Sequence, residues 1–227
     1  MTTASFPRTP HLFIPPGLDI RDDKVLSPDE CAAMLRHALV VEEKVDGANL
    51  GISLDGQGRF EYQNRNHRFS SGAKGQFEKL GEWAYARYEG LHRQLSQRYV
   101  LFGEWCYARH SVIYDRLPDY FLGFDVWDRQ EAFFLGTRER DLFFQEAGVQ
   151  GVRRIADGRF TRESLMELLL TTRSAYADTP VEGLVIRQDE GGRLTGRAKL
   201  VRPDFIQGIS THWSKGRLER NRLAGEG

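Results

Sequence analysis

The chain has 227 residues, is 40% hydrophobic and 28% charged, and balances 32 lysines and arginines against 32 aspartates and glutamates. It is long enough to bury the core of one large domain, it has no apolar run of the ~18 residues that a membrane span needs, and its zero net charge excludes global attraction to a polyanion. Its two cysteines are too few for a disulfide framework and show no metal-ligand spacing. We therefore expect a soluble, monomeric protein without a signal peptide, located in the cytoplasm.

Residues 1–26 are predicted to form an extended N-terminal arm, because four of the eight prolines fall between residues 5 and 19. A helix follows in "SPDECAAMLRHAL". There Ser27 is the expected N-cap, Pro28 suits the first helical position, and Glu30 completes a capping box.

The middle of the chain alternates short strands with helices. The segments "VVEEKV", "NLGISL" and "RFEYQN" have the composition of strands, and the "DGQG" turn joins the last two into a hairpin. Residues 74–95 are predicted to form one amphipathic helix, since apolar residues recur there at steps of three and four. Strands resume at "YVLFGEW" and "YFLGFDVWD".

The remaining predicted elements are helices at 137–147 and 161–171, the second capped by Thr161, and strands at 182–187 and 194–201. This mixed order predicts an α+β fold of antiparallel β-sheets flanked by helices, rather than a doubly wound dinucleotide fold. The chain also lacks a G-x-G-x-x-G, a Walker loop, an H-E-x-x-H and a G-x-S-x-G motif.

One lysine stands out because of its neighbours. Lys44 follows two acids, Glu42 and Glu43, which by themselves are typical of a surface ion pair. It also begins "KVDGAN", a K-x-D-G-x-N motif that contains Asp46 and Asn49. Further short motifs on predicted strands are "LFGEW" with Glu104, "FLGFDVWD" with Phe124, "VEGLVIR" with Glu182, and "RAKLVR" with Arg197 and Lys199.

In order and approximate spacing, these motifs resemble those of the covalent nucleotidyltransferases, the superfamily of polynucleotide ligases and mRNA capping enzymes. The resemblance covers residues 42 to about 202. Asn49 resembles the RNA ligases of that superfamily, whereas DNA ligases and capping enzymes usually carry arginine there. The N-terminal "FPRTPHL" and the C-terminal "HWSKGRLERNRL" are similar to those of bacterial stand-alone RNA ligase domains.

The resemblance implies an ATP-grasp-like ligase adenylation domain over residues 27–202 and an ATP-dependent RNA ligase activity. Lys44 would attack the α-phosphorus of ATP, the AMP would pass to an RNA 5′-phosphate, and an RNA 3′-hydroxyl would displace it. The implied cofactors are ATP as substrate and Mg²⁺ or Mn²⁺. An end-healing kinase or phosphatase is a further partner that this role in RNA repair suggests.

Elementary electrostatics adds a condition to that chemistry. A lysine with a pKa of about 10.4 is neutral only about once in several thousand molecules at pH 7, and neighbouring acids favour its charged form. A divalent cation beside the phosphates, together with Lys199 and Arg197, is expected to oppose them. Since Mg²⁺ keeps several waters, the carboxylates are expected to hold it through water.

The roles that the resemblance implies are as follows. The expected catalytic residues are Lys44, Asp46, Glu104, Glu182 and Lys199. The expected ATP-binding residues are Glu42, Glu43, Lys44, Val45, Asn49, Arg65, Glu104, Phe124, Glu182, Arg197 and Lys199. The expected metal-binding residues are Asp46, Glu104 and Glu182. The local excess of basic residues in segment 193–222, and not the resemblance, makes Arg202, Lys215, Arg217 and Arg220 the expected RNA-binding residues. Phe124 is equally typical of a core residue, and Arg65 of a surface residue.

The chain departs from the family pattern near its C-terminal end. Arg197 stands where the family commonly has the first lysine of K-x-K, which replaces a point charge by a planar fork. Only 28 residues follow Lys199, so we expect residues 203–227 to form a basic C-terminal segment and no separate oligonucleotide-binding barrel. Such a segment suits an RNA backbone, and a solvated charged helix has the same composition.

Two alternatives remain at this point. A DNA ligase or a GTP-using capping enzyme shares the lysine chemistry, but is disfavoured by Asn49. A non-catalytic module that binds RNA or a nucleotide belongs to a different class, and the complete set of motif residues argues against it.

Overall fold

The computed structural model describes residues 6–18, 23–65, 67–69, 74–207 and 218–226. Its strands are β1 (Leu39–Lys44), β2 (Ala48–Leu54), β3 (Phe60–Gln63), β4 (Arg68–Phe69), β5 (Tyr99–Trp105), β6 (Phe121–Asp128), β7 (Phe133–Phe134), β8 (Gln150–Gly151), β9 (Arg154–Gly158), β10 (Gly183–Glu190) and β11 (Arg193–Val201). Its helices are α1 (Pro28–Leu35), the 3₁₀-helix η1 (Gly75–Phe77), α2 (Leu80–Ala86), α3 (Tyr88–Leu95), α4 (Thr137–Ala147), α5 (Arg162–Thr171) and α6 (Pro203–Gln207).

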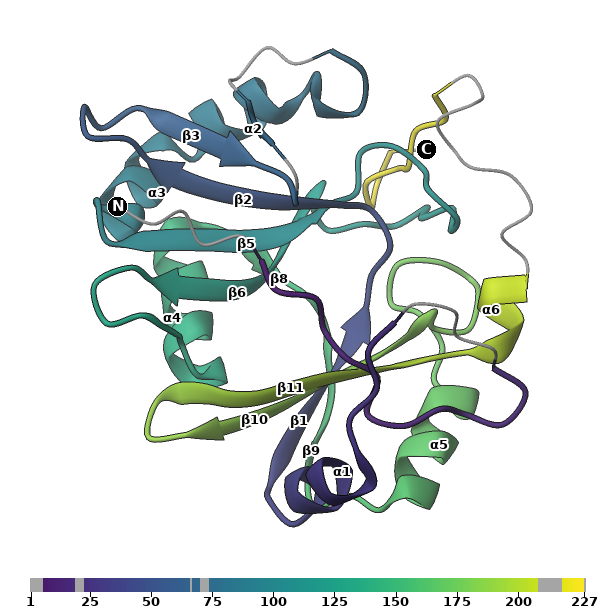
Figure 1. Ribbon diagram of the computed structural model, residues 1–227. Coiled ribbons are helices and arrows are strands. Elements are labelled where there is room, and N and C mark those ends of the chain that lie inside the picture. Colours follow the sequence, from purple (N-terminus) through teal and green to yellow (C-terminus); the bar gives the residue numbers. More distant parts are fainter. Residues whose placement is uncertain (1–5, 19–22, 66, 70–73, 208–217, 227) are drawn as a thin grey trace.

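The strands form two sheets, which Figure 1 shows one above the other, with the end of β1 connected to the start of β2. The smaller sheet has the order β11-β10-β1-β9 and is antiparallel. The larger sheet has the order β4-β3-β2-β5-β6-β7, and the short strand β8 joins β6 in the one parallel pairing among the described strands. The predicted α+β class with antiparallel sheets is therefore confirmed.

Each sheet packs one apolar face against its own helices. Buried residues of β1, β10 and β11 lie against α1 and α5, with Leu12 and Phe13 of the N-terminal segment in the same cluster. Buried residues of β2, β5 and β6 lie against α2, α3 and α4. Because burial of apolar side chains dominates the stability of a fold, each core fixes the position of its own sheet on one side of the junction between the two sheets.

The junction is a connection of three residues. Strand β1 ends at Lys44 in the smaller sheet and β2 begins at Ala48 in the larger one, so Val45, Asp46 and Gly47 carry the chain across. A Cβ atom at Gly47 would lie 2.7 Å from the backbone oxygen of Trp105. The close approach of the connection to β5 therefore requires glycine at this position.

Local signals at the helix starts are confirmed. Ser27 Oγ accepts a hydrogen bond from the Glu30 amide at 3.2 Å, and the Glu30 carboxylate accepts one from the Ser27 amide at 2.7 Å. Thr161 caps α5 through the Ser164 amide. Both caps are made within four residues, so sequence alone is sufficient to locate them.

The single helix predicted over residues 74–95 is wrong. The structure has η1, α2 and α3 there, with a break at Arg87, whose backbone angles are φ −116° and ψ 15°. The Arg87 guanidinium donates hydrogen bonds to the Trp83 carbonyl and to Asp119. In a continuous helix the Trp83 carbonyl would accept a hydrogen bond from the Arg87 amide, but here it accepts one from the Arg87 side chain. Since Asp119 also holds that side chain, tertiary contacts end α2 at this residue.

The two terminal segments lie against the body of the protein. The Pro10 carbonyl accepts a hydrogen bond from the Lys199 amide, and the Leu12 amide donates to the Lys199 carbonyl. At the other end, the buried Asn221 side chain donates to the Cys106 carbonyl at 2.7 Å and accepts from the Tyr114 amide at 2.9 Å. Of the helices in the described part of the chain, none is both long and apolar enough to cross a bilayer.

Candidate active site

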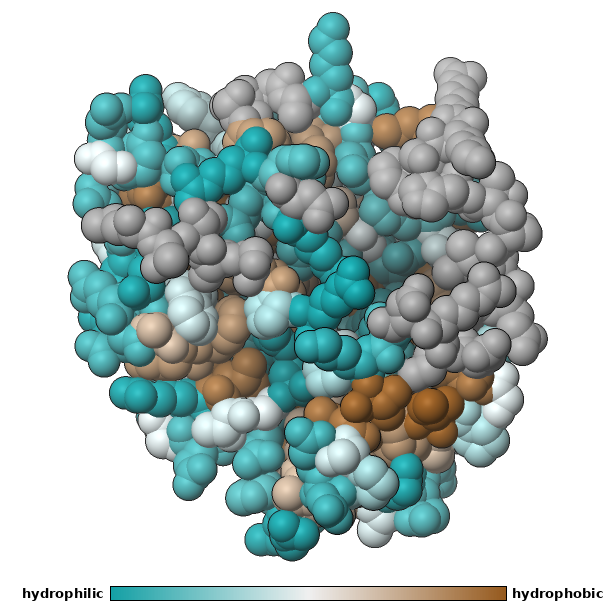
Figure 2. Space-filling view, viewed as in Figure 1, coloured by the Kyte–Doolittle hydropathy of each residue, from teal (hydrophilic) through white to brown (hydrophobic). Residues whose placement is uncertain are grey.

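The described residues enclose a pocket of about 340 Å³ where the two sheets meet, a size within the usual range of small-molecule sites. Hydrophilic side chains cover the middle of this face in Figure 2. All residues predicted to bind ATP line the pocket except Glu182, namely Glu42, Glu43, Lys44, Val45, Asn49, Arg65, Glu104, Phe124, Arg197 and Lys199. The structure brings them together, and their contact with ATP stays a prediction.

Lys44 forms an ion pair with Glu182 across the smaller sheet. The pairing of β1 with β10 places Lys44 opposite Gly183, so the neighbouring Glu182 reaches the lysine from the adjacent strand. The Lys44 side chain is 24% exposed and that of Glu182 is 6% exposed. The lysine side chain can thus be reached from the pocket, whereas the Glu182 carboxylate is buried.

The charges around Lys44 favour its ammonium form in the free protein. Burial by itself would lower the pKa of the lysine, but Glu182, Asp46 and Glu104 together outweigh burial and raise that pKa above its ordinary value. Burial also raises the pKa of the Glu182 carboxyl, although Lys44 opposes the shift. A nucleophilic lysine therefore needs additional positive charge in the pocket before it can lose its proton.

Asp46 and Glu104 are fixed by backbone amides of the connection between the sheets and of a nearby loop. The Asp46 carboxylate accepts a hydrogen bond from the Ser111 amide at 2.6 Å. Glu104 Oε1 accepts one from the Gly47 amide at 3.1 Å. Burial raises the pKa of Glu104 to about 8, with the nearby Asp46 carboxylate acting in the same direction.

The three carboxylates expected to bind the metal fit a hydrated cation better than a directly ligated one. Within the described ranges, Asp46, Glu104 and Glu182 do not form a group of three that could ligate one metal ion directly. However, Glu182 Oε2 is buried and has no hydrogen-bond partner among the residues that the structure describes. An unpartnered buried carboxylate oxygen fits a hydrated cation, because a metal-bound water can donate to it.

Glu42 and Glu43 line the pocket, but other groups engage their carboxylates. Glu42 is buried in an ion pair with Arg140, whose nitrogen lies 2.6 Å away. Glu43 accepts hydrogen bonds from the Ser174 hydroxyl at 2.5 Å and from the Ala175 amide at 3.0 Å. Lys44 therefore pairs with Glu182 and not with either neighbouring acid, since each of those carboxylates is balanced by other groups.

The last motif places two basic residues on one face of β11. Arg197 and Lys199 are two residues apart on the strand, so their side chains lie on the same side, and both line the pocket. Lys199 pairs with Asp23 at 2.6 Å. Arg197 forms a buried ion pair with Asp125 and lies over the Phe6 ring at 4.2 Å.

Phe124, which was expected to bind ATP, is half-buried on the pocket wall. Its ring makes an edge contact with Phe6, with ring centroids 4.9 Å apart. Val185 lines the same pocket from β10. An aromatic face and an aliphatic side chain in one pocket are suited to a planar base.

Of the four residues predicted to bind RNA, Lys215 and Arg217 lie outside the described residues. The Arg202 guanidinium is already used, since it pairs with Asp204 and donates to the carbonyls of Leu169 and Leu170. Arg220 is 61% exposed and pairs with Glu78. Among the described members of that set, Arg220 is the more accessible one.

Several pocket residues were missed from the sequence: Phe6, Arg8, Thr9, Asp23, Asp125, Val152, Val185 and Arg187. Val185 and Arg187 had a usable signal, because they alternate along a predicted strand and so share one face. Asp125 directly follows Phe124, but a buried position opposite two arginines cannot be read from its neighbours. The first four residues belong to the predicted N-terminal arm, residues 1–26, for which the sequence predicted no role in the site.

Comparison with known proteins agrees with this geometry. A family model described as RNA ligase matches residues 37–201, which is most of the chain and includes Lys44, Glu104, Glu182 and Lys199. The chain belongs to the RNA ligase family. A search of curated protein sequences finds no significant match.

Solved structures of a Naegleria gruberi RNA ligase have the same fold as this RNA ligase family member. One mutant form of that ligase, solved with ATP and Mn, aligns with a TM-score of 0.62 at 16% identity, covering 86% of this chain and 59% of that one. Another mutant form, solved with AMP and Mn, aligns with a TM-score of 0.58 at 17% identity, covering 91% and 64%. The chain therefore spans less than two thirds of the length of these structures.

Proposed function

We propose that this protein is an ATP-dependent RNA ligase in which Lys44 forms a covalent bond to AMP. The observation that carries the proposal is the position of Lys44: the side chain stands at the end of β1, is reachable from a pocket of nucleotide size, and is surrounded by the motif residues of an RNA ligase family. The Naegleria gruberi structures with ATP, AMP and Mn support a nucleotide and a divalent cation in this fold.

In the proposed first step, Lys44 Nζ attacks the α-phosphorus of ATP, a phosphorus–nitrogen bond forms, and pyrophosphate leaves. In the second, an oxygen of an RNA 5′-phosphate displaces the lysine and takes the AMP. In the third, an RNA 3′-hydroxyl attacks that 5′-phosphate and AMP leaves. Each step is a displacement at phosphorus, for which positioning and charge neutralisation supply most of the catalysis.

The residues of the pocket have separate tasks in this scheme. Glu182 keeps the Lys44 ammonium in place before ATP arrives, and Lys199 lies on the adjacent strand as a phosphate-binding cation. Asp46, Glu104 and Glu182 would hold the waters of a hydrated Mg²⁺ or Mn²⁺. When bound, that cation neutralises phosphate charge and lowers the pKa of the lysine ammonium.

RNA with 5′-phosphate and 3′-hydroxyl ends is the proposed substrate, with end-healing enzymes as functional partners. The RNA ligase family match and Asn49 favour RNA over DNA. Asn49 lies opposite Glu104 in the β2–β5 pairing, on the pocket wall. The pocket continues into a second hollow that Asp46, Asn64, Gln76 and His110 line beside Lys44, which offers polar groups to an RNA end.

The test is incubation of the protein with each labelled nucleoside triphosphate and Mg²⁺, followed by denaturing electrophoresis. We expect covalent labelling from ATP that is sensitive to acid and hydroxylamine, absent in Lys44→Ala and in Lys44→Arg, and lost in EDTA. Equal labelling of Lys44→Ala would refute the nucleophile. Preferential labelling by GTP would make the protein a capping-type enzyme, and the absence of any label would favour a binding module.

A second assay tests the substrate. Joining of a 5′-adenylylated RNA to an RNA 3′-hydroxyl end should proceed without ATP, since the activated phosphate is already present. The same reaction with a DNA 3′-hydroxyl end should be slower. Equal sealing of all-DNA nicks would contradict the RNA assignment.

A further inference from the structure

The N-terminal segment is built into the wall of the nucleotide pocket. Hydrogen bonds at Pro10 and Leu12 pair it with the backbone of Lys199 on β11. Five residues earlier than His11, the Phe6 ring packs among the rings of Phe102, Phe124 and Phe134. Residues 7–9 therefore span the pocket between two fixed points, one beside Lys199 and one beside Phe124.

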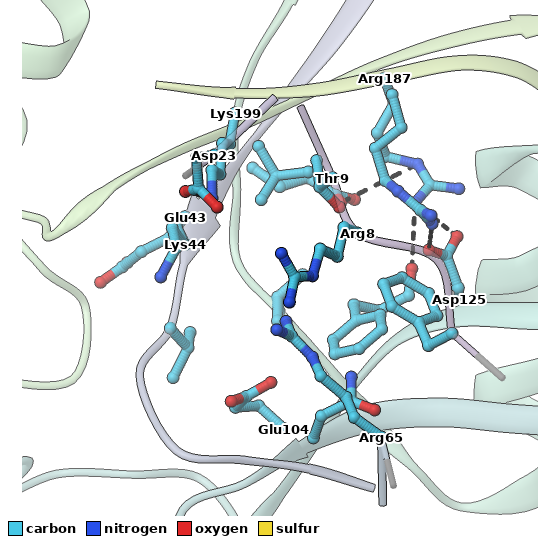
Figure 3. Close-up of a pocket in the computed structure, with 18 residues that line it drawn as sticks. Arg8, Thr9, Asp23, Glu43, Lys44, Arg65, Glu104, Asp125, Arg187 and Lys199 are labelled. Carbon is cyan, nitrogen blue, oxygen red and sulfur yellow. Dashed lines mark hydrogen bonds and ion pairs between the residues drawn. The ribbon is translucent and has the colours of Figure 1, made fainter. Parts of the chain in front are cut away.

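Arg8 is at the centre of this span. Figure 3 shows its guanidinium reaching into the middle of the pocket, with Lys44 to one side and Arg65 and Glu104 below it. The residue is exposed. The segment thus presents a flexible cation to the space in which the phosphates of ATP must lie if Lys44 is the nucleophile.

Most of the positive charge in the pocket is already balanced. Six basic residues line it: Arg8, Lys44, Arg65, Arg187, Arg197 and Lys199. Four of them form ion pairs with described carboxylates: Lys44 with Glu182, Arg187 and Arg197 with Asp125, and Lys199 with Asp23. Arg8 and Arg65 have no ion pair with any carboxylate in the described ranges.

Arg197 is a poor phosphate ligand in this arrangement. It occupies the position of a lysine in the family motif, but its side chain is only 9% exposed. Its guanidinium is held by Asp125 and covered by the rings of Phe6 and Phe134. Withdrawal of Arg197 from a buried partner would leave the Asp125 charge less compensated, which is costly in a protein interior.

We propose that Arg8 binds the β- and γ-phosphates of ATP. Arg8 thus makes the phosphate contact that Arg197 does not make, because Asp125 and Phe6 hold the Arg197 side chain. The inference rests on the proposed function, because it places the α-phosphorus against Lys44. In-line displacement then sends pyrophosphate away from the lysine, and a guanidinium is well suited to hold two phosphate oxygens at once.

The decisive measurement compares ATP with AMP. Binding of each nucleotide with Mg²⁺ is measured by calorimetry in a Lys44→Met background, which prevents turnover. Arg8→Ala should weaken ATP binding about tenfold, the usual effect of one hydrogen bond to a charged group, and should leave AMP binding unchanged. Arg8→Lys should restore part of the ATP affinity. Lys24→Ala, an exposed cation near the same segment that does not line the pocket, is the matched control and should bind both nucleotides normally.

The same variants with Lys44 intact separate this inference from the proposed function. Arg8→Ala should raise the KM for ATP in lysine adenylylation and leave the joining of 5′-adenylylated RNA unchanged. Equal loss of ATP and AMP affinity would overturn the proposal, since the segment would then be structural. Slower joining with normal ATP binding would also overturn it and assign Arg8 to the RNA 5′-phosphate. Failure of the parent protein to bind or attach any nucleotide would instead refute the ligase function.

Discussion

Lys44 and Glu182 form an ion pair between the last residue of β1 and the residue before β10, where the chain passes from the smaller sheet into the larger one. The pair favours the ammonium form of Lys44, which is not nucleophilic. In the proposed function, binding of ATP and a cation must therefore shift the balance of charge in the pocket before the amine can attack phosphorus. On that proposal, the pair makes the reactivity of Lys44 depend on occupancy of the site.

Glu182→Gln should separate the acidity of Lys44 from catalysis. Because Glu182 is the strongest of the charges that raise the lysine pKa, its removal should lower that pKa and shift acylation of Lys44 by an amine reagent to lower pH. Adenylylation should nevertheless fall by roughly hundredfold, the typical effect of losing one preorganised electrostatic group. Mass spectrometry of the Lys44 peptide across a pH series measures the first effect. An unchanged acylation profile would show that Glu182 does not control the lysine.

Glu104→Gln should change how stability depends on pH. The pKa of Glu104 in the folded protein is about 8, above its ordinary value of 4.5, so the folded state binds this proton more tightly than the unfolded state. The resulting stability is complete below pH of about 4.5 and is lost as the pH rises through about 8. Glutamine stays neutral and can still accept the hydrogen bond from the Gly47 amide.

The Tm of Glu104→Gln relative to that of the parent protein should therefore rise between pH 5 and pH 8.5. Differential scanning calorimetry across that range measures the difference. Glu89→Gln, on the exposed face of α3, controls for the general loss of one negative charge. A Tm difference that is constant with pH would contradict the raised pKa.

Arg140→Met should destabilise the fold through a buried charge. Arg140 is 3% exposed and pairs with Glu42, which is 1% exposed. Of the described residues that pair with Glu42, the substitution leaves only the more distant Arg187. Removal of one partner of a buried pair costs about 3 kcal/mol or more. Denaturant unfolding measures the loss, and Arg138→Met on the exposed side of α4 is the control. The double variant Arg140→Met with Glu42→Leu should recover much of the stability.

RNA joining should depend on salt more steeply than lysine adenylylation does. Contacts to RNA phosphates release counterions and weaken as salt rises, whereas formation of lysyl-AMP needs no RNA. Arg217→Glu with Arg220→Glu should impair joining far more than adenylylation, and Arg36→Glu at the end of α1 should affect neither. Gel assays of RNA joining and of lysine adenylylation at increasing potassium chloride concentration measure the difference in their salt dependence. Joining that is undiminished at high salt would show that these basic residues do not hold RNA.

The sequence by itself determined the features that depend on short-range order. The caps at Ser27 and Thr161 are made within four residues, and strand alternation placed Arg197 and Lys199 on one face. The antiparallel α+β class followed from the order of hairpins and helices. Most motif residues also met in one pocket, with Glu182 paired to Lys44 beside it and Asp46 in the adjoining hollow, because each lies on or beside a strand whose neighbours are set by sheet pairing.

Only the tertiary structure decided which charges are free. Arg197 and Lys199 look equivalent in the sequence, yet Asp125 buries the first and Asp23 pairs with the second from a distant part of the chain. Arg87 ends α2 because of Asp119, and Arg8 enters the pocket because β11 pairs with residues 10–12. Such partners are tens to hundreds of residues apart, and the energy of a charge depends on its distance to them and on its burial, which no local pattern of residues contains.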